Sequence, residues 1–194
     1  MKLALIGCGK KKKGEASTPE QMKPLFDTTD THSERENRYE AEDLYTSRYF
    51  ALKTAYAKQH CDTRFILSAK HGIIPPAYRL SRYDVRITQS GFEGEGTPNY
   101  ETVEDWGSHV VATIKNIYEY RNSSRRESLS SIITLAGSPY LSPIRNQLET
   151  LPIDINTPFD NTSGIGDQIK WLNNHTDPHW NVEGTQKKLT DSFR

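Results

Sequence analysis

The residues best suited to chemistry lie near the start of the chain, where Gly7, Cys8 and Gly9 precede four lysines at positions 10–13. Positive charge near a cysteine raises its thiolate fraction, so we predict Cys8 as a catalytic nucleophile. Glycines let the backbone turn sharply and approach a ligand closely. Lysine charge and loop amides favour a phosphate or another anion, and the predicted contacts to it are Gly7, Gly9, Lys10, Lys11 and Lys12. The alternative is a small buried cysteine beside a solvated basic loop.

A second candidate group follows an apolar segment and comprises Ser68, Lys70, His71 and Gly72. Histidine titrates near neutral pH, so His71 is predicted to act as an acid or a base. Asp84 is the carboxylate that would orient His71 or serve as a base itself. Lys70 would bind an oxyanion or a phosphate, and Ser68 and Gly72 would contact the same substrate. The alternatives are a polar turn whose histidine bonds to backbone, and a surface turn around Asp84.

A third group lies later in the chain, at Gly137, Ser138 and Tyr140. Gly137 and Ser138 would hold a ribose or a phosphate at the start of a helix. Tyr140 or Tyr45 would stack on a base, although aromatic residues at helical spacing more often belong to the core. Ser47, two residues after Tyr45, completes the predicted contacts and is also a candidate helix cap.

The spacing of the residues excludes several familiar sites. The lysine run lacks the spacing and the Ser or Thr of a phosphate-binding P-loop. No Gly-x-Ser-x-Gly elbow surrounds Ser68. Cys8, Cys61 and the histidines have no recognised zinc-ligand spacing, so no metal site is predicted. The sequence indicates neither a cofactor nor an oligomeric state.

Strands that alternate with helices are predicted to position these residues. Apolar runs predict strands at 2–6, 64–68, 131–136 and 153–157, with a shorter extended segment at 83–88. Periodicity predicts helices at 39–59, 102–120, 142–148 and 164–173, with Thr102 and Asp105 as a capping pair for the second. Residues 14–38 and 89–100 are polar and are predicted to form loops.

This alternation predicts an α/β fold, with a mainly parallel central sheet and helices on both faces in a three-layer sandwich. A single domain would span residues 1–174, followed by a polar C-terminal tail at 175–194. Ligands of such sheets bind outside the carboxyl ends of the strands. The turns at 7–13, 68–72 and 137–140 each follow a predicted strand, so we expect them to meet along this edge and form one site.

The composition narrows the class of protein. The 194 residues include 25 Lys and Arg and 25 Asp and Glu, so the net charge is zero. A domain dedicated to duplex binding is usually basic overall, so any nucleic-acid contact here would need a local patch. Two cysteines do not make a disulfide framework. No apolar run approaches the ~20 residues of a membrane span, and the first residues do not resemble a signal peptide. A cytoplasmic location without membrane contact is therefore predicted.

Several blocks resemble a family of small uncharacterised prokaryotic and phage proteins. They lie at 7–12 (Gly-Cys-Gly-Lys-Lys-Lys), 41–47, 66–72, 83–84, 135–140 and 164–172. More distantly, the Cys8-x-x-x-Lys12 spacing and residues 68–88 are similar to one domain of archaeosine synthase, a tRNA-guanine transglycosylase-related enzyme that modifies a deazaguanine nitrile in tRNA. This likeness implies that the cysteine-and-lysine motif of that enzyme corresponds to Cys8 and Lys12. The Pro-Tyr that follows the motif in archaeosine synthase is replaced by Lys13 and Gly14, and the transglycosylase barrel is absent.

Together these features predict an enzyme that acts on a nucleobase, nucleoside or nucleotide, free or within nucleic acid. The reaction would be base modification or cleavage at the glycosidic bond, in the transferase or hydrolase class. One alternative is a non-catalytic nucleotide-binding or nucleic-acid-binding module of a modification or defence system. Another is a stress-related protein whose basic loop is only solvated. The partner expected in the first two cases is a nucleotide or a nucleic acid.

Overall fold

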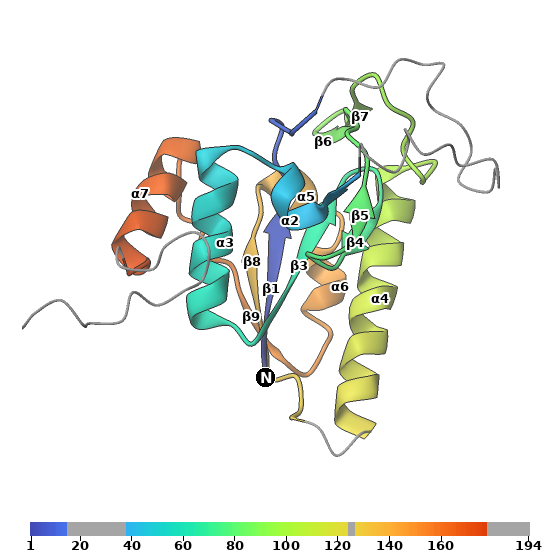
Figure 1. The fold of residues 1–194 in the computed structure, drawn as a ribbon. Coiled ribbons are helices and arrows are strands. Elements are labelled where there is room, and N and C mark those ends of the chain that lie inside the picture. Colours follow the sequence, from blue (N-terminus) through green and yellow to red (C-terminus); the bar gives the residue numbers. More distant parts are fainter. Residues whose placement is uncertain (15–37, 124–126, 178–194) are drawn as a thin grey trace, which may run out of the picture.

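A five-stranded sheet forms the centre of the protein, in a computed structural model that describes residues 1–14, 38–123 and 127–177. The strand order is β4-β3-β1-β8-β9 (Figure 1). Four strands run parallel, namely β1 (Lys2–Gly7), β3 (Thr63–Ser68), β8 (Ser131–Leu135) and β9 (Asp154–Asn156). The edge strand β4 (Gly72–Ile74) turns back antiparallel to β3. The predicted α/β fold with a mainly parallel sheet is therefore confirmed.

The central strands are apolar along almost their whole length. Leu3, Ala4, Leu5 and Ile6 of β1 are all buried, as are the last four residues of β8. A parallel strand that is covered on both faces forms a continuous apolar run instead of an alternating one. This pattern explains why the apolar runs located β1 and β8, and the bounds predicted for all four parallel strands lie within one residue of those in the structure.

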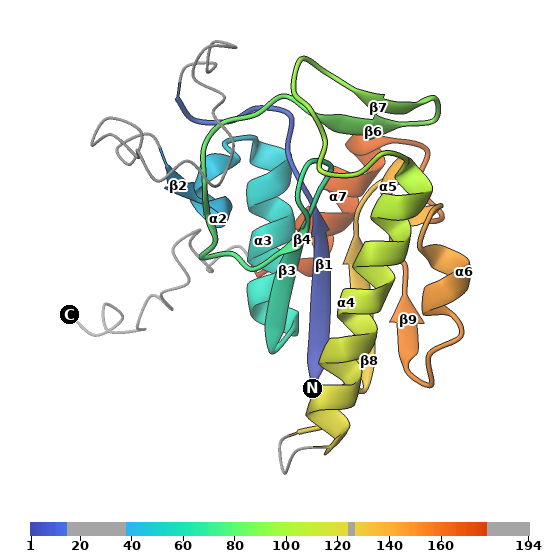
Figure 2. The same ribbon diagram turned by 90° about the vertical axis from the view of Figure 1, so that its right-hand side faces the viewer.

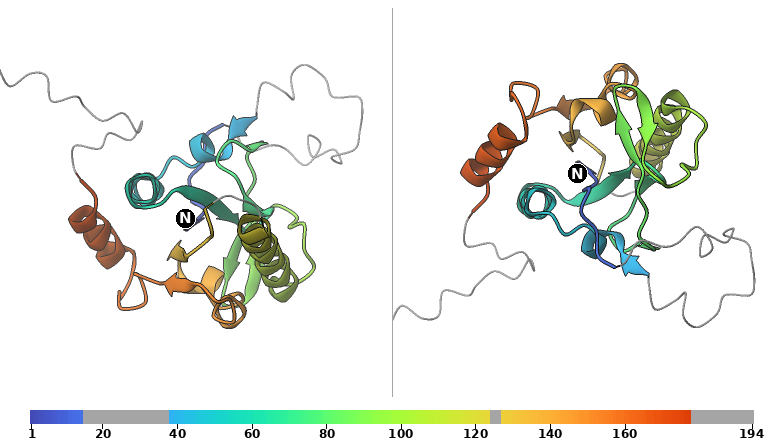
Figure 3. Two further views of the ribbon diagram at one scale, coloured as in Figure 1. Left: turned by 90° about the horizontal axis from the view of Figure 1, so that it is seen from below. Right: turned by 90° about the horizontal axis from the view of Figure 1, so that it is seen from above.

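Helices lie on both sides of the sheet, namely α3 (Arg48–His60), α4 (Val103–Ser123), α6 (Arg145–Leu148) and α7 (Ile165–His175). Figures 2 and 3 show α3 and α7 on one side and α4 and α6 on the other. The chain moves from β1 to its neighbour β3, and later crosses back to the other neighbour, β8. Because crossovers between parallel strands are right-handed, this reversal places α3 and α4 on opposite faces. The three-layer organisation itself stays a prediction.

Short elements lie beyond the carboxyl ends of the parallel strands. β6 (Arg86–Thr88) and β7 (Gly91–Glu93) form a hairpin, and β2 (Tyr39–Glu40) pairs with β5 (Arg79–Leu80). The one-turn helices α2 (Ala41–Leu44) and α5 (Ser138–Leu141) lie at the same end of the molecule (Figure 2). The residues predicted for the site therefore lie among these short elements. Most of the predicted loop at 14–38 and of the tail at 175–194 lies outside the described residues.

The helix predicted at 39–59 is two helices, α2 and α3, with an extended residue between them. Tyr45 has φ −88° and ψ 115° and forms a β-bridge with Lys12. The neighbouring backbone bonds run from Lys13 N to Leu44 O (2.8 Å) and from Thr46 N to Lys11 O (3.0 Å). The Ser47 cap already predicted a second helical segment after a break, and the break begins at Tyr45 because the backbone of the distant lysine segment pairs with this stretch, a contact that helical periodicity does not report.

The capping residues were predicted better than the helix bounds. Ser47 caps α3, and its Oγ accepts a hydrogen bond from Phe50 N at 3.2 Å. At α4, Asp105 N donates to Thr102 Oγ1 (3.0 Å) and Thr102 N donates to Asp105 Oδ2 (3.1 Å). Both predicted caps are confirmed, because a short polar side chain before a helix satisfies backbone N–H groups that have no partner within the helix.

Other predicted bounds differ from those in the structure. The helix expected to begin at Ser142 begins at Ser138 as α5, with Gly137 as its N-cap, and α6 starts only at Arg145. Two Ser-Pro pairs fit the same cap pattern, and the first one starts the helix. The extended segment at 83–88 is a strand only in β6, and the predicted loop at 89–100 contains β7. The last helix, α7, continues to His175, where the tail was expected to start.

We predict that Gly94→Ala destabilises the protein more than Gly91→Ala does. Both glycines have positive φ, 116° and 121°, where any side chain costs roughly 1–2 kcal/mol. A Cβ on Gly94 would lie 2.1 Å from the backbone oxygen of Asp84, whereas a Cβ on Gly91 meets nothing within 4 Å. The backbone clash should bring the loss at Gly94 to about 3 kcal/mol or more. Urea unfolding of the two variants measures this difference, and equal losses would contradict the crowding.

Candidate functional site

The carboxyl ends of β1 and β8 are the point where the connections of the sheet diverge. From β1 the chain continues to β3 on one side, and from β8 it continues to β9 on the other. Open α/β sheets bind their ligands outside the strand ends at such a reversal. Cys8 follows β1 directly, and Tyr140 lies on α5 after β8. The Cys8 Sγ and Tyr140 Oη atoms are 3.2 Å apart, so a half-buried thiol and a phenol occupy this position.

A chain of buried hydroxyl groups lies beside the thiol. Tyr83 Oη is 2.5 Å from Tyr45 Oη and 2.7 Å from Ser68 Oγ. Ser68 Oγ in turn accepts a hydrogen bond from His71 N at 3.0 Å. Burial raises the pKa of Tyr45 and Tyr83 well above the usual value, so both are neutral phenols at pH 7. The chain ties the turn after β3 to Tyr45, and Tyr45 serves here as a core aromatic with a polar end.

The four consecutive lysines point in different directions. Lys10, Lys11 and Lys13 are exposed, whereas Lys12 is only 8% exposed. Lys12 Nζ lies 4.6 Å from the ring centroid of Tyr83 and 5.7 Å from that of Tyr45. Burial lowers the pKa of Lys12, and the charges of Cys8 and Asp84 partly offset this effect. Within the described ranges no carboxylate lies within 4 Å of Lys12. Lys12 is therefore a largely buried cation near the thiol.

Lys53 on α3 was not among the predicted site residues. It is 2% exposed, and its Nζ donates a hydrogen bond to Gly7 O at 2.6 Å, one residue before Cys8. Burial lowers the pKa of Lys53 to about 8, although attraction to Cys8 raises it in part. A signal was present in the sequence, because Phe50, Lys53, Thr54 and Ala57 recur at core-facing helical spacing. With the helix started at the Ser47 cap, Lys53 falls within a stripe of core-facing residues, and its position predicts a buried lysine.

The imidazole of His71 contacts Tyr83 and Asn99. Its ring meets the ring of Tyr83 edge-on at 5.1 Å, and its Nδ1 is 3.4 Å from Asn99 Nδ2. Burial, together with the charge of Lys70, lowers the pKa of His71 to about 4. Among the described residues neither Cys8 nor Asp84 is a hydrogen-bond partner of His71. His71 is thus a neutral base that joins the site through Tyr83 and Ser68.

The remaining predicted site residues contribute little to the cluster of buried side chains around Cys8. Asp84 is exposed next to the inward-facing Tyr83, and its charge acts on Lys12 instead of His71. Gly9 lies close to Ser47, whose hydroxyl is used in capping α3. Gly72 starts β4, and Lys70 is half-buried, which lowers its pKa. The structure therefore brings Cys8, Lys12, Tyr45, Ser68 and Tyr140 together, and it places Lys10 and Lys11 outside this cluster.

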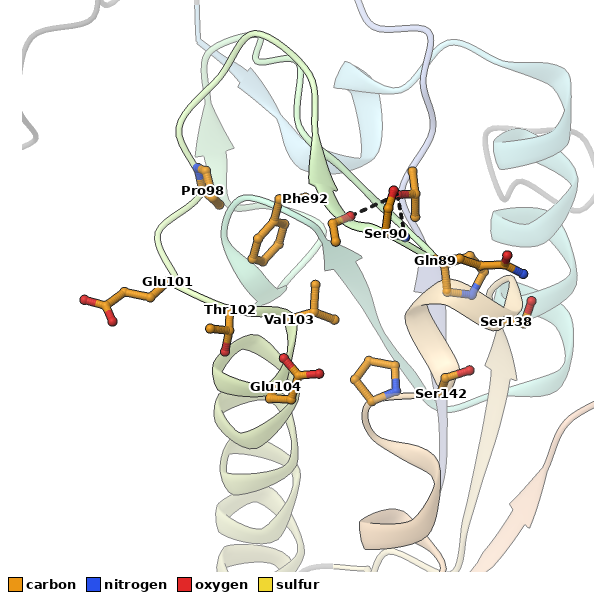
Figure 4. A pocket seen from close by; sticks show the side chains of 14 residues that line it. Gln89, Ser90, Phe92, Pro98, Glu101, Thr102, Val103, Glu104, Ser138 and Ser142 are labelled. Carbon is orange, nitrogen blue, oxygen red and sulfur yellow. Dashed lines mark hydrogen bonds between the residues drawn. The ribbon is translucent and has the colours of Figure 1, made fainter.

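A groove of about 840 Å³ opens between the β6–β7 hairpin, the start of α4, and α5 (Figure 4), and none of the residues of the cluster around Cys8 lines it. Hydroxyl and amide side chains line much of it, namely those of Thr88, Gln89, Ser90, Thr102, Ser138 and Ser142. Phe92 and Pro98 add apolar surface, and Glu101 and Glu104 add carboxylates. No lysine or arginine is among these lining residues. Because α5 carries both Ser138 and Tyr140, this helix forms a wall of the groove and also reaches the thiol.

None of the helices in the described ranges combines the length and the apolar composition that a membrane crossing needs. Across the same ranges no three His, Cys, Asp or Glu side chains gather as a metal site would require.

The fold and this edge cluster define an α/β protein with a thiol at the reversal point of a mostly parallel sheet. A family model matches residues 28–174, most of the chain, and the protein belongs to that family, DUF6884, which is described as a family of unknown function. No curated protein and no solved structure matches the chain. The resemblance to an uncharacterised family is thereby supported, whereas none of these comparisons connects the chain with archaeosine synthase.

Proposed function

We propose that this DUF6884 protein is an enzyme that acts on a nucleobase, nucleoside or nucleotide, with Cys8 as its nucleophile. The observation that carries the proposal is the position of Cys8, a half-buried thiol beside a phenol and near two buried lysines. Positive charge around a thiol raises its thiolate fraction. A thiolate attacks electrophilic carbon, and the C=N carbons of a nucleobase and the carbon of a nitrile group are of this kind.

The reaction would begin with addition of Cys8 to the substrate. A sulfur–carbon bond forms while one electron pair of the substrate's carbon–nitrogen multiple bond moves onto nitrogen, which then takes a proton. Lys12 is the better donor of this proton, because burial lowers its pKa while it raises that of Tyr140. His71 is neutral at pH 7 and can accept a proton in a later step. The resulting covalent adduct is the intermediate from which base modification would proceed.

The groove supports a substrate of nucleoside size. Small-molecule sites commonly measure roughly 300–1,000 Å³, and this groove falls within that range. Its hydroxyl, amide and carboxylate groups suit the hydroxyls of a ribose, and Phe92 offers a flat apolar face. A base held next to Tyr140 would then lie within reach of Cys8, because α5 borders both places.

The exposed lysines favour a second candidate, a non-catalytic module that binds nucleotides or nucleic acid. Lys10 and Lys11 are exposed and take no part in the buried cluster. Exposed lysines bind phosphate backbones without any chemistry at a thiol. In this case Cys8 would be a small residue in the packing, and the lysine charges would determine affinity.

Intact-protein mass spectrometry separates the two candidates. We expect wild-type protein, incubated singly with nucleobases, nucleosides, nucleotides and a deazaguanine nitrile, to gain the mass of one compound, and Cys8→Ser to gain none. Peptide mapping should place the adduct on Cys8. The matched control is Cys61→Ser, because Cys61 is the other cysteine, burial raises its pKa to about 11, and its loss should leave the adduct intact.

The binding module predicts a different pattern. Charge reversal at Lys10 and Lys11 would then weaken binding of a single-stranded oligonucleotide by about tenfold or more, and Cys8→Ser would bind as the wild type does. No adduct with any compound, together with this pattern, would overturn the enzyme in favour of the module. If the protein forms no adduct and also binds no oligonucleotide, the enzyme and the binding module are both wrong.

A further inference from the structure

We propose that Lys53 is the charge partner that keeps Cys8 as a thiolate, and that it acts as a positioning residue for the nucleophile. The inference rests on the role of Cys8 in the proposed function, and it adds a residue from the middle of α3 to the site. Lys53 does not touch a substrate in this arrangement, because it is almost fully buried behind Gly7. Its effect on the chemistry would pass through the sulfur of Cys8.

The surroundings of Lys53 leave its charge uncompensated by any acid. Its Nζ bonds to Gly7 O and lies 4.4 Å from the ring centroid of Tyr49 and 5.9 Å from that of Phe50. A carbonyl oxygen and two ring faces attract a cation but carry no net negative charge. No carboxylate lies within ion-pair distance of Lys53 in the part of the chain that the structure describes. Burying an ammonium without an anionic partner is unfavourable.

Cys8 directly follows Gly7, whose carbonyl oxygen lies 2.6 Å from Lys53 Nζ, and among the described residues its charge attracts Lys53. It is half-buried and follows the carbonyl that Lys53 binds, so the ammonium and the sulfur lie on the same stretch of backbone. A thiolate at Cys8 would compensate the ammonium, and the ammonium would stabilise the thiolate in return. Pairing with a thiolate would thus offset the cost of burying Lys53.

The other ionisable groups that face Cys8 do not replace Lys53. Tyr45, Tyr83 and Tyr140 remain neutral phenols, because burial raises the pKa of each. Lys12 is a second cation near Cys8, but it is also influenced by Asp84 and by the like charge of Arg82. Among the described residues no carboxylate acts on Lys53 in this way, so the charge of Lys53 acts mainly on the Cys8 thiol.

Alkylation by iodoacetamide tests the pairing without any substrate. The thiolate sulfur forms a bond to the reagent's methylene carbon and iodide leaves, so the rate follows the thiolate fraction. We expect Lys53→Met to slow alkylation of Cys8 at pH 7 by about tenfold, the effect of ~1.4 kcal/mol on the thiolate, and the rate to recover at pH 10. Methionine suits the buried position, because apolar replacements of buried charges are often tolerated. Lys53→Arg should keep most of the wild-type rate, because it keeps the charge.

Two controls belong to the same measurement. Lys58→Met alters the same helix at a lysine that pairs with Glu42, and it should leave the rate at Cys8 unchanged. Cys61, read in the same digest, should react slowly in every variant, because burial raises its pKa to about 11. Thiolate absorbance at pH 7, taken as wild type minus Cys8→Ser, provides a reading that needs no Lys53 variant to fold.

The outcomes separate this inference from the proposed function. If Lys53→Met and wild type alkylate Cys8 equally fast at pH 7, Lys53 is only a packing residue, and the nucleophile stands if the nucleoside adduct forms. If the absorbance difference shows no thiolate at pH 7, the pairing is wrong even where the adduct is found. If Cys8 carries a thiolate but no adduct forms with any nucleobase compound, the pairing stands and the proposed substrate class fails.

Discussion

Replacing Trp106 by alanine is expected to lower the free energy of unfolding by about 4 kcal/mol, within the range of roughly 3–5 kcal/mol for buried aromatic truncations. Trp106 is completely buried on α4. Its Nε1 donates a hydrogen bond to Ser68 O at 2.8 Å, and its ring meets the ring of Tyr140 edge-on at 5.8 Å. Truncation would leave a cavity and a buried carbonyl without its partner, between the two turns that build the candidate site.

Urea unfolding measures this loss of stability. The variant Trp106→Phe helps to separate the part due to the side-chain hydrogen bond from the part due to ring packing. Phenylalanine keeps one aromatic ring but removes the N–H and part of the indole volume, so it should cost less than alanine, and the unsatisfied buried acceptor alone contributes about 1–3 kcal/mol. Trp171→Ala is the matched control, because Trp171 is only partly buried and stacks on His175 at 4.2 Å. A loss at Trp106→Ala no larger than that at Trp171→Ala would show that the packing between α4 and the site is looser than described.

Stability is expected to fall by about 3 kcal/mol between pH 7 and pH 4 because of His71 alone. The folded-state pKa of about 4 lies below the usual 6.5, since burial and the charge of Lys70 disfavour the imidazolium. Each pKa unit corresponds to ~1.4 kcal/mol. The unfolded chain binds the His71 proton more tightly than the folded protein does. The contribution of neutral His71 to the free energy of unfolding is therefore complete above pH 6.5 and is lost as the pH falls toward 4.

The comparison of wild type with His71→Gln isolates this effect, since carboxylates titrate at low pH in both proteins. We expect the stability difference between the two proteins to narrow or invert in favour of His71→Gln as the pH falls from 7 to 4. NMR titration of the imidazole carbon signals provides the direct test. His109, which is exposed on α4, is the internal reference. A His71 midpoint between pH 6 and 7 would refute the buried neutral base.

The sequence was most informative where local chemistry decides the structure. Continuous apolar runs located β1 and β8, because strands covered on both faces are apolar almost throughout. Ser47 and the Thr102–Asp105 pair were recognisable as caps, because their side chains satisfy backbone groups within three residues. The edge where Cys8 and Tyr140 meet followed from the rule that parallel strands present their carboxyl ends together.

Residues far apart in the chain decided what the sequence could not. Tyr45 leaves the helix because Lys12 pairs with it, a contact across more than thirty residues. Tyr83, not Asp84, faces inward, and it connects Tyr45 with Ser68. Neither contact has a signal in local periodicity, because a pattern of polar and apolar residues does not specify which distant side chain fills a given space.

The amino-acid sequence by itself determined an α/β protein that presents a cysteine immediately after its first strand. Only the tertiary structure decided which lysines are buried, since Lys12 and Lys53 turn inward while Lys10 and Lys11 remain in solvent. The physical reason is that a lysine becomes buried when aromatic rings and a backbone carbonyl pack around its ammonium. Those neighbours come from β1, α3 and the segment at Tyr83, which only folding brings together.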